Sequence, residues 1–140
     1  MPSEYRLKRR VHFYEVDLAG IVHFSTYFRY MEEAEHALWR EAGLSIAQPG
    51  QDIGFPRVNA SCDYMSPLRF EDEFEVLVRV AAISRRSLRY TFLVTRGDTQ
   101  IARGAATIVC VSKRPGEPMK STAIPVEIAS RFSVAEGGDA

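Results

Sequence analysis

The sequence lacks the features of several large protein classes. It has two cysteines, Cys62 and Cys110, in neither a CxxC pair nor a Cys/His spacing typical of a zinc site. Both lie in apolar, strand-like segments, so we expect buried free thiols rather than a disulfide. No apolar run approaches the roughly 20 residues of a membrane-spanning helix. The first residues form no apolar signal segment either, which favours a cytoplasmic protein.

The chain also lacks an excess of charge of either sign. Its 140 residues include 18 Lys and Arg and 18 Asp and Glu, so the formal net charge is zero. Without a global positive field, no partnership with nucleic acid or an anionic membrane is expected, and no aromatic and basic RNA motif occurs. A content of 46% hydrophobic and 26% charged residues is that of an ordinary globular protein. The length predicts a single domain over residues 1–140.

One long helix is expected between two recognisable ends. Ser25 and Thr26 offer hydroxyls suited to an N-cap, and Gly43 tolerates a left-handed C-cap. Apolar residues between them follow one another at helical spacing: Tyr27, Met31, Ala34, Leu38 and Ala42. The remaining positions are mostly polar, and a solvated face is expected for Glu32, Glu33 and Glu35. The pattern predicts a helix of about 18 residues with one buried stripe.

Most of the remaining chain alternates with the period of two that is typical of half-buried strands. Strands are expected at residues 5–13, where Arg9 interrupts the alternation, and at 57–65, 74–80, 88–95 and 101–111. Turn residues at 84–87 and 96–99 predict that the strands on either side are antiparallel neighbours. We further expect a short helix at about 125–132 and a frayed tail from about 134 to 140.

These elements predict an α+β fold in which the helix stripe covers one face of an antiparallel sheet. Apolar residues on the other alternation, namely Leu77, Leu93, Ile108 and Cys110, indicate that the second face is also buried. A second subunit would bury that face, and we therefore expect a homo-oligomer.

A carboxylate and a glycine precede the start of the expected helix. Backbone N–H groups of a first helical turn have no intrahelical partners, so they can bind a carbonyl oxygen that gains negative charge during acyl transfer. The carboxylate of Asp17 can attack such a carbonyl or activate water. An aspartate before a helix is more often a cap or loop residue. On spacing alone, both interpretations stay open.

The stretch DLAGIVHFSTYFRYME, from Asp17 to Glu32, resembles the signature of the 4-hydroxybenzoyl-CoA thioesterase family of hotdog-fold proteins. That signature is approximately D-x-x-G-x-V-[YWH]-[HYF]-x-N-Y followed by a helix. The resemblance extends to residues 67–72, to the turn at 83–88 and to the end of the last strand, and so covers nearly the whole chain. It implies a five- or six-stranded antiparallel sheet wrapped around one long central helix. It also implies active sites at a dimer interface, commonly in a homotetramer.

The resemblance assigns roles residue by residue. It implies that Asp17 is the nucleophile or general base, that Phe24 offers a backbone N–H to the thioester carbonyl, and that Gly20 shapes the turn. Substrate contacts are expected from Val22, His23, Thr26 and Glu32. The family's basic residues for the coenzyme A nucleotide correspond to Arg85, Arg86 and Ser87, whose groups suit phosphate oxygens. Lys113 and Arg114 would add charge there or stay solvated. No cofactor or metal is expected, coenzyme A being part of the substrate.

Two residues depart from the family pattern. Phe24 stands where many members that prefer aliphatic acyl chains have histidine, and Thr26 stands where most have asparagine. Phenylalanine makes the pocket more apolar and suits an aromatic acyl group. We expect an acyl- or aroyl-CoA thioesterase. A thioesterase acting on acyl carrier protein and a non-catalytic acyl-CoA-binding protein remain alternatives, whereas the His-based pattern of hotdog hydratases is absent.

Overall fold

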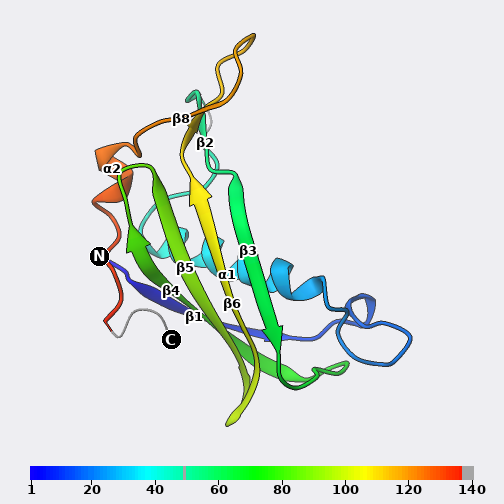
Figure 1. Cartoon of the computed structure of the whole chain (residues 1–140). Helices are drawn as coiled ribbons and strands as arrows, with labels where there is room; N and C mark the ends of the chain where they lie inside the picture. The colour runs from blue at the N-terminus through cyan, green and yellow to red at the C-terminus, as the bar shows by residue number, and fades with distance from the viewer. Residues whose placement is uncertain (49, 137–140) are drawn as a thin grey trace.

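The computed structural model describes residues 1–48 and 50–136. Its main sheet is antiparallel and has five strands in the order β1-β4-β5-β6-β3, with helix α1 lying across one face (Figure 1). The bounds are β1 Glu4–Arg10, β3 Arg57–Tyr64, β4 Glu73–Ile83, β5 Ser87–Arg96, β6 Thr99–Val109 and α1 Thr26–Glu41. The predicted α+β class, with one long helix and antiparallel neighbours β4, β5 and β6, is confirmed.

Smaller elements flank this sheet. A second sheet, β2-β7-β8, joins β2 (Ile53–Gly54), β7 (Val111–Ser112) and β8 (Lys120–Ser121), while η1 (Phe13–Glu15) and α2 (Val126–Ala129) are short helices. The short C-terminal helix was expected; the second sheet was not, because strands of two residues show no periodicity. No helix in the described part of the chain is long and apolar enough to cross a membrane.

Helix α1 packs on the sheet through the predicted stripe. All five stripe residues are buried: Tyr27, Met31, Ala34, Leu38 and Ala42. The helix ends as expected: Gly43 has φ +79°, and the N–H of Leu44 donates to the Trp39 carbonyl at 2.9 Å. Its start differs, because the Ser25 hydroxyl bonds Nδ1 of His23 at 2.8 Å and caps no backbone N–H. The hydroxyl thus fixes the loop before α1 rather than the helix terminus.

Two expectations about burial on β1 and α1 are wrong. Strand β1 ends at Arg10, and Phe13 lies in η1 with 73% of its surface exposed, because the chain turns away from the sheet. On α1, Glu35 is fully buried instead of solvated. The guanidinium of Arg57, at the start of β3, donates to Glu35 Oε1 at 2.6 Å. A buried carboxylate requires such a partner.

The outer face of the sheet carries fewer apolar residues than expected. Leu77 and Leu93 lie opposite each other in the β4–β5 ladder and outside the core beneath α1, whereas Ile108 and Cys110 belong to that core. The β5–β6 register shifts between Val94 and Thr95, and this irregularity changes the phase of β6. The second apolar face is therefore a narrow one. Both cysteines are free thiols, and of the two only Cys110 is fully buried.

The chain's end is anchored further than expected. Ala135 is buried and its N–H donates to the carbonyl of Val80 at 2.9 Å, so the frayed tail does not begin at residue 134. The rest of the expected tail, residues 137–140, lies outside the described residues.

Candidate active site

The candidate site is built on the loop between η1 and α1. The N–H of Asp17 donates to the Ile21 carbonyl at 2.8 Å, and the N–H of Gly20 donates to the Asp17 carbonyl at 3.0 Å, which closes a tight turn. Gly20 has φ +79°, a conformation that glycine adopts without a Cβ penalty. One Asp17 carboxylate oxygen accepts the Ala19 N–H at 2.8 Å. Among the described residues, no donor binds the other oxygen, which leaves it free for water or substrate.

The second limb of this turn is tied both to the protein body and to the first limb. The N–H of Val22 donates to the Leu68 carbonyl at 2.8 Å, and the N–H of His23 donates to the Glu15 carbonyl at 2.9 Å. An isolated antiparallel bridge joins Val16 to Val22. Asp17 therefore lies at the tip of a small hairpin that rests on the segment preceding β4.

Phe24 follows this hairpin and is separated from α1 only by Ser25. Its carbonyl accepts the Tyr64 hydroxyl at 2.7 Å, its ring stacks on His23 with centroids 4.6 Å apart, and its side chain is 64% exposed. The Phe24 N–H donates to no group in the described part of the chain. An unpaired N–H beside a helix N-terminus can stabilise a developing oxyanion, an effect that the helix dipole strengthens.

A pocket of about 380 Å³ opens between this loop and the end of β3. It is lined by Asp17, Ile21, Val22, Phe24, Tyr27, Tyr64, Met65, Ser66 and Pro67. The Tyr27 and Tyr64 rings meet edge to face, 5.2 Å between centroids. Burial, with a smaller contribution from Cys62, raises the pKa of Tyr64 to about 12. The phenol therefore stays protonated and keeps donating to Phe24 at physiological pH.

The predicted site residues are only partly gathered around this pocket. Asp17, Val22 and Phe24 line it, and Gly20 shapes the adjoining turn. His23 is exposed and contacts Phe24 and Ser25. Thr26 begins α1 outside the lining. Glu32 faces a different pocket of about 400 Å³, shared with Glu35, Arg57 and Lys113, and lies 4.0 Å from an Arg57 nitrogen.

The turn expected to bind coenzyme A is far from Asp17 in the same chain. Arg85, Arg86 and Ser87 connect β4 to β5 beside α2, whereas the loop before α1 lies at the other end of β4 (Figure 1). The 11 residues of β4 separate them by roughly 30 Å. Arg86 donates to the Ser121 hydroxyl at 2.9 Å, and Arg114 and Ser121 line one pocket of about 370 Å³.

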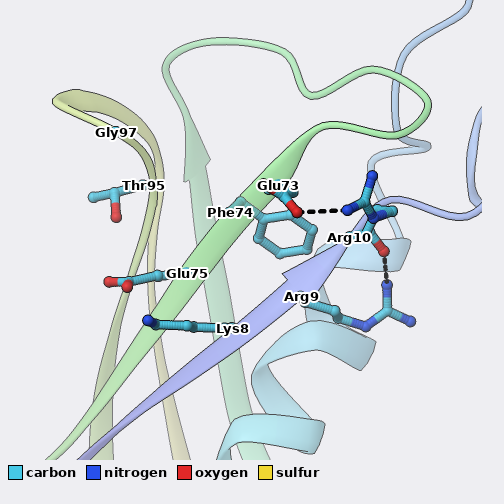
Figure 2. A pocket seen from close by; sticks show the side chains of 8 residues that line it. All are labelled: Lys8, Arg9, Arg10, Glu73, Phe74, Glu75, Thr95 and Gly97. Atoms are coloured by element: carbon cyan, nitrogen blue, oxygen red, sulfur yellow. Dashed lines mark hydrogen bonds and ion pairs between the residues drawn. The ribbon is translucent and has the colours of Figure 1, made fainter.

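A larger pocket, of about 570 Å³, lies elsewhere, over β1, β4 and the β5–β6 turn. Figure 2 shows that two of its arginines are already engaged: Arg10 donates to Glu73 at 2.5 Å, and Arg9 donates to the Arg10 backbone carbonyl at 3.0 Å. This pocket contains no helix N-terminus. It also contains no carboxylate that is without a paired cation and lies beside an unpaired backbone N–H. This larger pocket therefore lacks the features that the sequence predicts for an acyl-transfer site.

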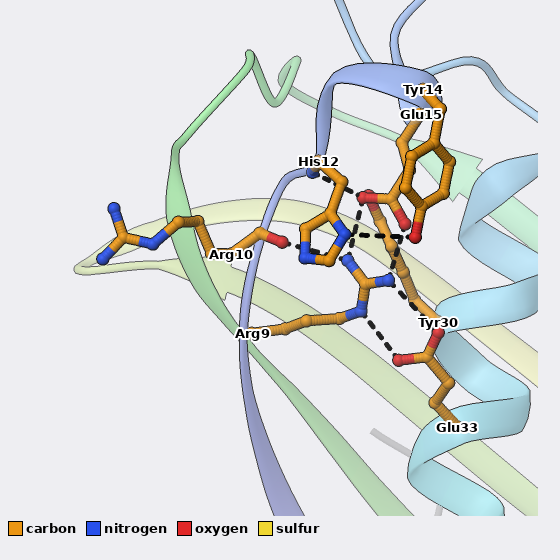
Figure 3. A network of polar contacts seen from close by, with 7 residues as sticks. All are labelled: Arg9, Arg10, His12, Tyr14, Glu15, Tyr30 and Glu33. Atoms are coloured by element: carbon orange, nitrogen blue, oxygen red, sulfur yellow. Dashed lines mark hydrogen bonds and ion pairs between the residues drawn. The ribbon is translucent and has the colours of Figure 1, made fainter.

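Sequence reasoning missed a buried polar network behind the Asp17 hairpin. Glu15 is only 6% exposed and binds Arg9 and Tyr30, and Arg9 also binds Glu33 (Figure 3). A signal was present in the sequence, because Arg9 interrupts the alternation of its strand. An arginine at an inward position requires a buried anion, and Glu15 supplies it.

Comparison with known proteins identifies relatives of the whole domain. The family model of the thioesterase-like superfamily matches residues 11–132. An Aquifex aeolicus protein is 39% identical over 130 residues, covering 91% of this chain and 95% of its own length. The acyl-CoA thioester hydrolase YbgC of Escherichia coli is 25% identical, with coverages of 91% and 95%.

Solved structures agree with the fold. The crystal structure of a hypothetical Aquifex aeolicus protein superposes with a TM-score of 0.85 at 32% identity, covering 92% of this chain and 99% of that one. A gentisyl-coenzyme A thioesterase superposes with a TM-score of 0.79 at 26% identity, covering 89% and 98%. The predicted hotdog fold, with five strands and one long helix, is confirmed, as is the resemblance to thioester hydrolases. The chain belongs to the thioesterase-like superfamily.

Proposed function

We propose that this protein is an acyl-CoA thioesterase that hydrolyses an acyl- or aroyl-CoA to the free acid and coenzyme A. One observation carries the proposal: a carboxylate with a free oxygen, on Asp17, and the residue with an unpaired backbone N–H, Phe24, line the same pocket at the start of α1. Membership of the thioesterase-like superfamily supports the reaction class.

The chemistry follows from these two groups. Asp17 attacks the thioester carbonyl, or removes a proton from a water molecule that attacks it, and the Phe24 N–H binds the oxygen that becomes negative. The carbon–sulfur bond then breaks and coenzyme A leaves as a thiolate. Because a free thiol has a pKa of about 8.5, the thiolate leaves without a strong general acid. Water supplies the oxygen of the product acid, directly or by hydrolysing an acyl-aspartate.

The position of the Arg85–Ser87 turn favours a site shared between two subunits. The turn and Asp17 lie at opposite ends of β4, so one chain does not bring them to one substrate. Strand β3 is a sheet edge, and Val58 on it is 60% exposed. Unpaired edges pair readily with a second chain. In the proposed homodimer, Asp17 of one subunit and the Arg85–Ser87 turn of the other serve the same coenzyme A.

The pocket favours an aromatic acyl group. Phe24, Tyr27 and Tyr64 supply three rings to its wall, and offset or edge-to-face ring contacts stabilise an aroyl group beyond simple burial. The structural relative named as a gentisyl-coenzyme A thioesterase acts on an aromatic thioester by its name. An aliphatic thioester is the second candidate, because the relative YbgC is named only as an acyl-CoA thioester hydrolase.

The test is thiol release from short, long and aromatic acyl-CoAs by the intact protein and by Asp17→Asn. We expect turnover of one acyl class and a kcat at least about 10²-fold lower in the variant. Faster turnover of acyl carrier protein thioesters would favour the carrier-protein alternative. Tight acyl-CoA binding without thiol release would favour a non-catalytic binding protein. Equal rates for the two proteins would overturn the role of Asp17.

Mixed subunits test the shared site. Asp17→Asn and the double variant Arg85→Ala/Arg86→Ala are each impaired at low substrate concentration; co-expressed, they form mixed dimers in which one site has neither lesion. We expect recovery to about a quarter of the intact activity, because half of the dimers are mixed and each has one good site of two. No recovery in verified mixed dimers would mean that no site combines Asp17 of one subunit with the Arg85–Ser87 turn of the other.

A further inference from the structure

We propose that Glu15 is the positioning residue for Asp17, acting as a charged anchor that Arg9 and Tyr30 hold between β1 and α1. This inference rests on the proposed thioesterase function, because it concerns the geometry of the proposed catalytic carboxylate. Glu15 does not line the acyl pocket, so it acts through the hairpin and not on the substrate.

The Glu15 carboxylate accepts four hydrogen bonds from three residues. Arg9 approaches in a bidentate fork, with Nη1 2.8 Å from Oε1 and Nη2 2.6 Å from Oε2. The backbone N–H of His12 and the hydroxyl of Tyr30 donate to Oε1 at 2.8 and 3.0 Å (Figure 3). Three of the four bonds fall on Oε1 and one on Oε2, so Oε1 has no lone pair left for a further donor.

Arg9 is itself held on three sides. Its Nε donates to Glu33 on α1 at 2.7 Å, and its guanidinium lies 4.6 Å from the centre of the Tyr30 ring. The side chain is only 13% exposed. A bidentate pair flanked by a cation–π contact has little rotational freedom. Glu15 is thereby fixed to strand β1 and helix α1 at once.

The backbone of Glu15 connects this anchored side chain to the loop that holds Asp17. Its carbonyl accepts the N–H of His23 at 2.9 Å, which joins the two limbs of the hairpin whose tip holds Asp17. The Glu15 carbonyl therefore holds together the base of the turn whose tip carries Asp17.

The anchor requires an ionised Glu15. Burial opposes ionisation, but hydrogen bonds from Arg9, His12 and Tyr30 outweigh it and lower the pKa of Glu15 below its ordinary value. Glutamine has the same shape, yet its NH₂ group would face an Arg9 nitrogen, which only donates. Glu15→Gln thus breaks the fork while nearly preserving the volume.

The experiment is a double-mutant cycle on thiol release with Glu15→Gln, Asp17→Asn and the combined variant. We expect Glu15→Gln to lower kcat roughly 10-fold or more with KM changed by less than about 2-fold, since a small displacement of a reacting group is costly. In the Asp17→Asn background the same change should have almost no effect, because its loss acts through Asp17. Multiplicative losses in the double variant would overturn the proposal.

Glu73→Gln is the matched control. It removes an exposed ion pair with Arg10, the neighbour of Arg9 on β1, and it should leave kcat unchanged. If Glu15→Gln fails to fold, Tyr30→Phe removes one donor from the carboxylate and should show a smaller loss of the same kind. Amide hydrogen exchange at residues 17–20 should become faster in either variant, a readout independent of turnover. Unchanged exchange would also overturn the anchor.

The outcomes separate the two proposals. Equal rates for Asp17→Asn and the intact protein would reject the catalytic role of Asp17 whatever Glu15 does. A large loss in Asp17→Asn with no loss in Glu15→Gln would keep the thioesterase proposal and reject the anchor.

Discussion

Gly104 of β6 lies directly beneath Met31 of α1, and no side chain larger than hydrogen fits between them. A Cβ on Gly104 would meet the Met31 thioether and would also fall 2.8 Å from the carbonyl oxygen of Ser61 on β3. The thioether can move, but the backbone of the paired strand cannot. This close approach seats the middle of α1 on the sheet, and with it the start of the helix next to the acyl pocket.

Gly104→Ala is therefore expected to destabilise the protein by about 1–3 kcal/mol, the usual cost of overpacking. Gly54→Ala is the matched control, since a Cβ there would meet only the flexible Lys113 side chain, at 3.4 Å. It should change stability by less than about 0.5 kcal/mol. Urea unfolding of both variants checks this, and equal midpoints would contradict the packing argument.

Gly20→Ala should reduce activity through backbone strain alone. Gly20 has φ +79° and open space around its Cα, so an alanine would cost about 1–2 kcal/mol without a clash. The strain falls on the turn that holds Asp17, and kcat should drop several-fold. Gly116→Ala is the control: Gly116 has φ +80° and equal space in a distant turn, so stability should fall similarly while thiol release stays unchanged. Equal kcat in both variants would show that the Asp17 turn absorbs the strain.

The stability of the fold should depend on the charge of Glu15 at acid pH. Because the folded-state pKa of Glu15 lies below its ordinary value of 4.5, ionised Glu15 stabilises the fold fully above that value. The contribution is lost as the pH falls through the lower, folded-state pKa. Unfolding free energies measured between about pH 6 and about pH 3 should fall more steeply for the intact protein than for Glu15→Gln. Parallel curves would mean that Glu15 has no such role.

The sequence predicted the elements that obey a simple period. The stripe on α1 and the Gly43 cap follow local rules, and the paired strands β4, β5 and β6 follow from alternation and turn residues. Local rules do not specify which distant strands pair, so the positions of β1 beside β4 and β3 beside β6 needed the structure. The β6 irregularity changed the alternation, and this moved Ile108 to the core.

The site was predictable in part for a similar reason. Asp17, Gly20 and Phe24 fall within one contiguous segment, so a local resemblance was enough to propose them as site residues. The role of Glu15 could be recognised only from its long-range partners in the structure. It lies two residues before Asp17 and does not belong to the family signature. Arg9 was a local sign of this network, because it breaks the alternation of β1. The burial of Glu35 on α1 had no such sign, because a group of three glutamates within four residues is typical of a solvated helix face.

Arg85→Ala/Arg86→Ala should weaken substrate binding without harming the chemical step. Neither guanidinium lies near Asp17 in its own chain, and both suit the phosphates of coenzyme A. We expect KM for the best acyl-CoA to rise roughly 10-fold with kcat nearly unchanged, the signature of lost uniform binding. The matched substrate is the same acyl group on N-acetylcysteamine, which has the thioester but no nucleotide, and its kcat/KM should be the same for variant and intact protein. A parallel loss on both substrates would mean that the turn supports the fold, because Arg86 also binds Ser121. A KM increase confined to acyl-CoA would tie the phosphate-binding role to this turn.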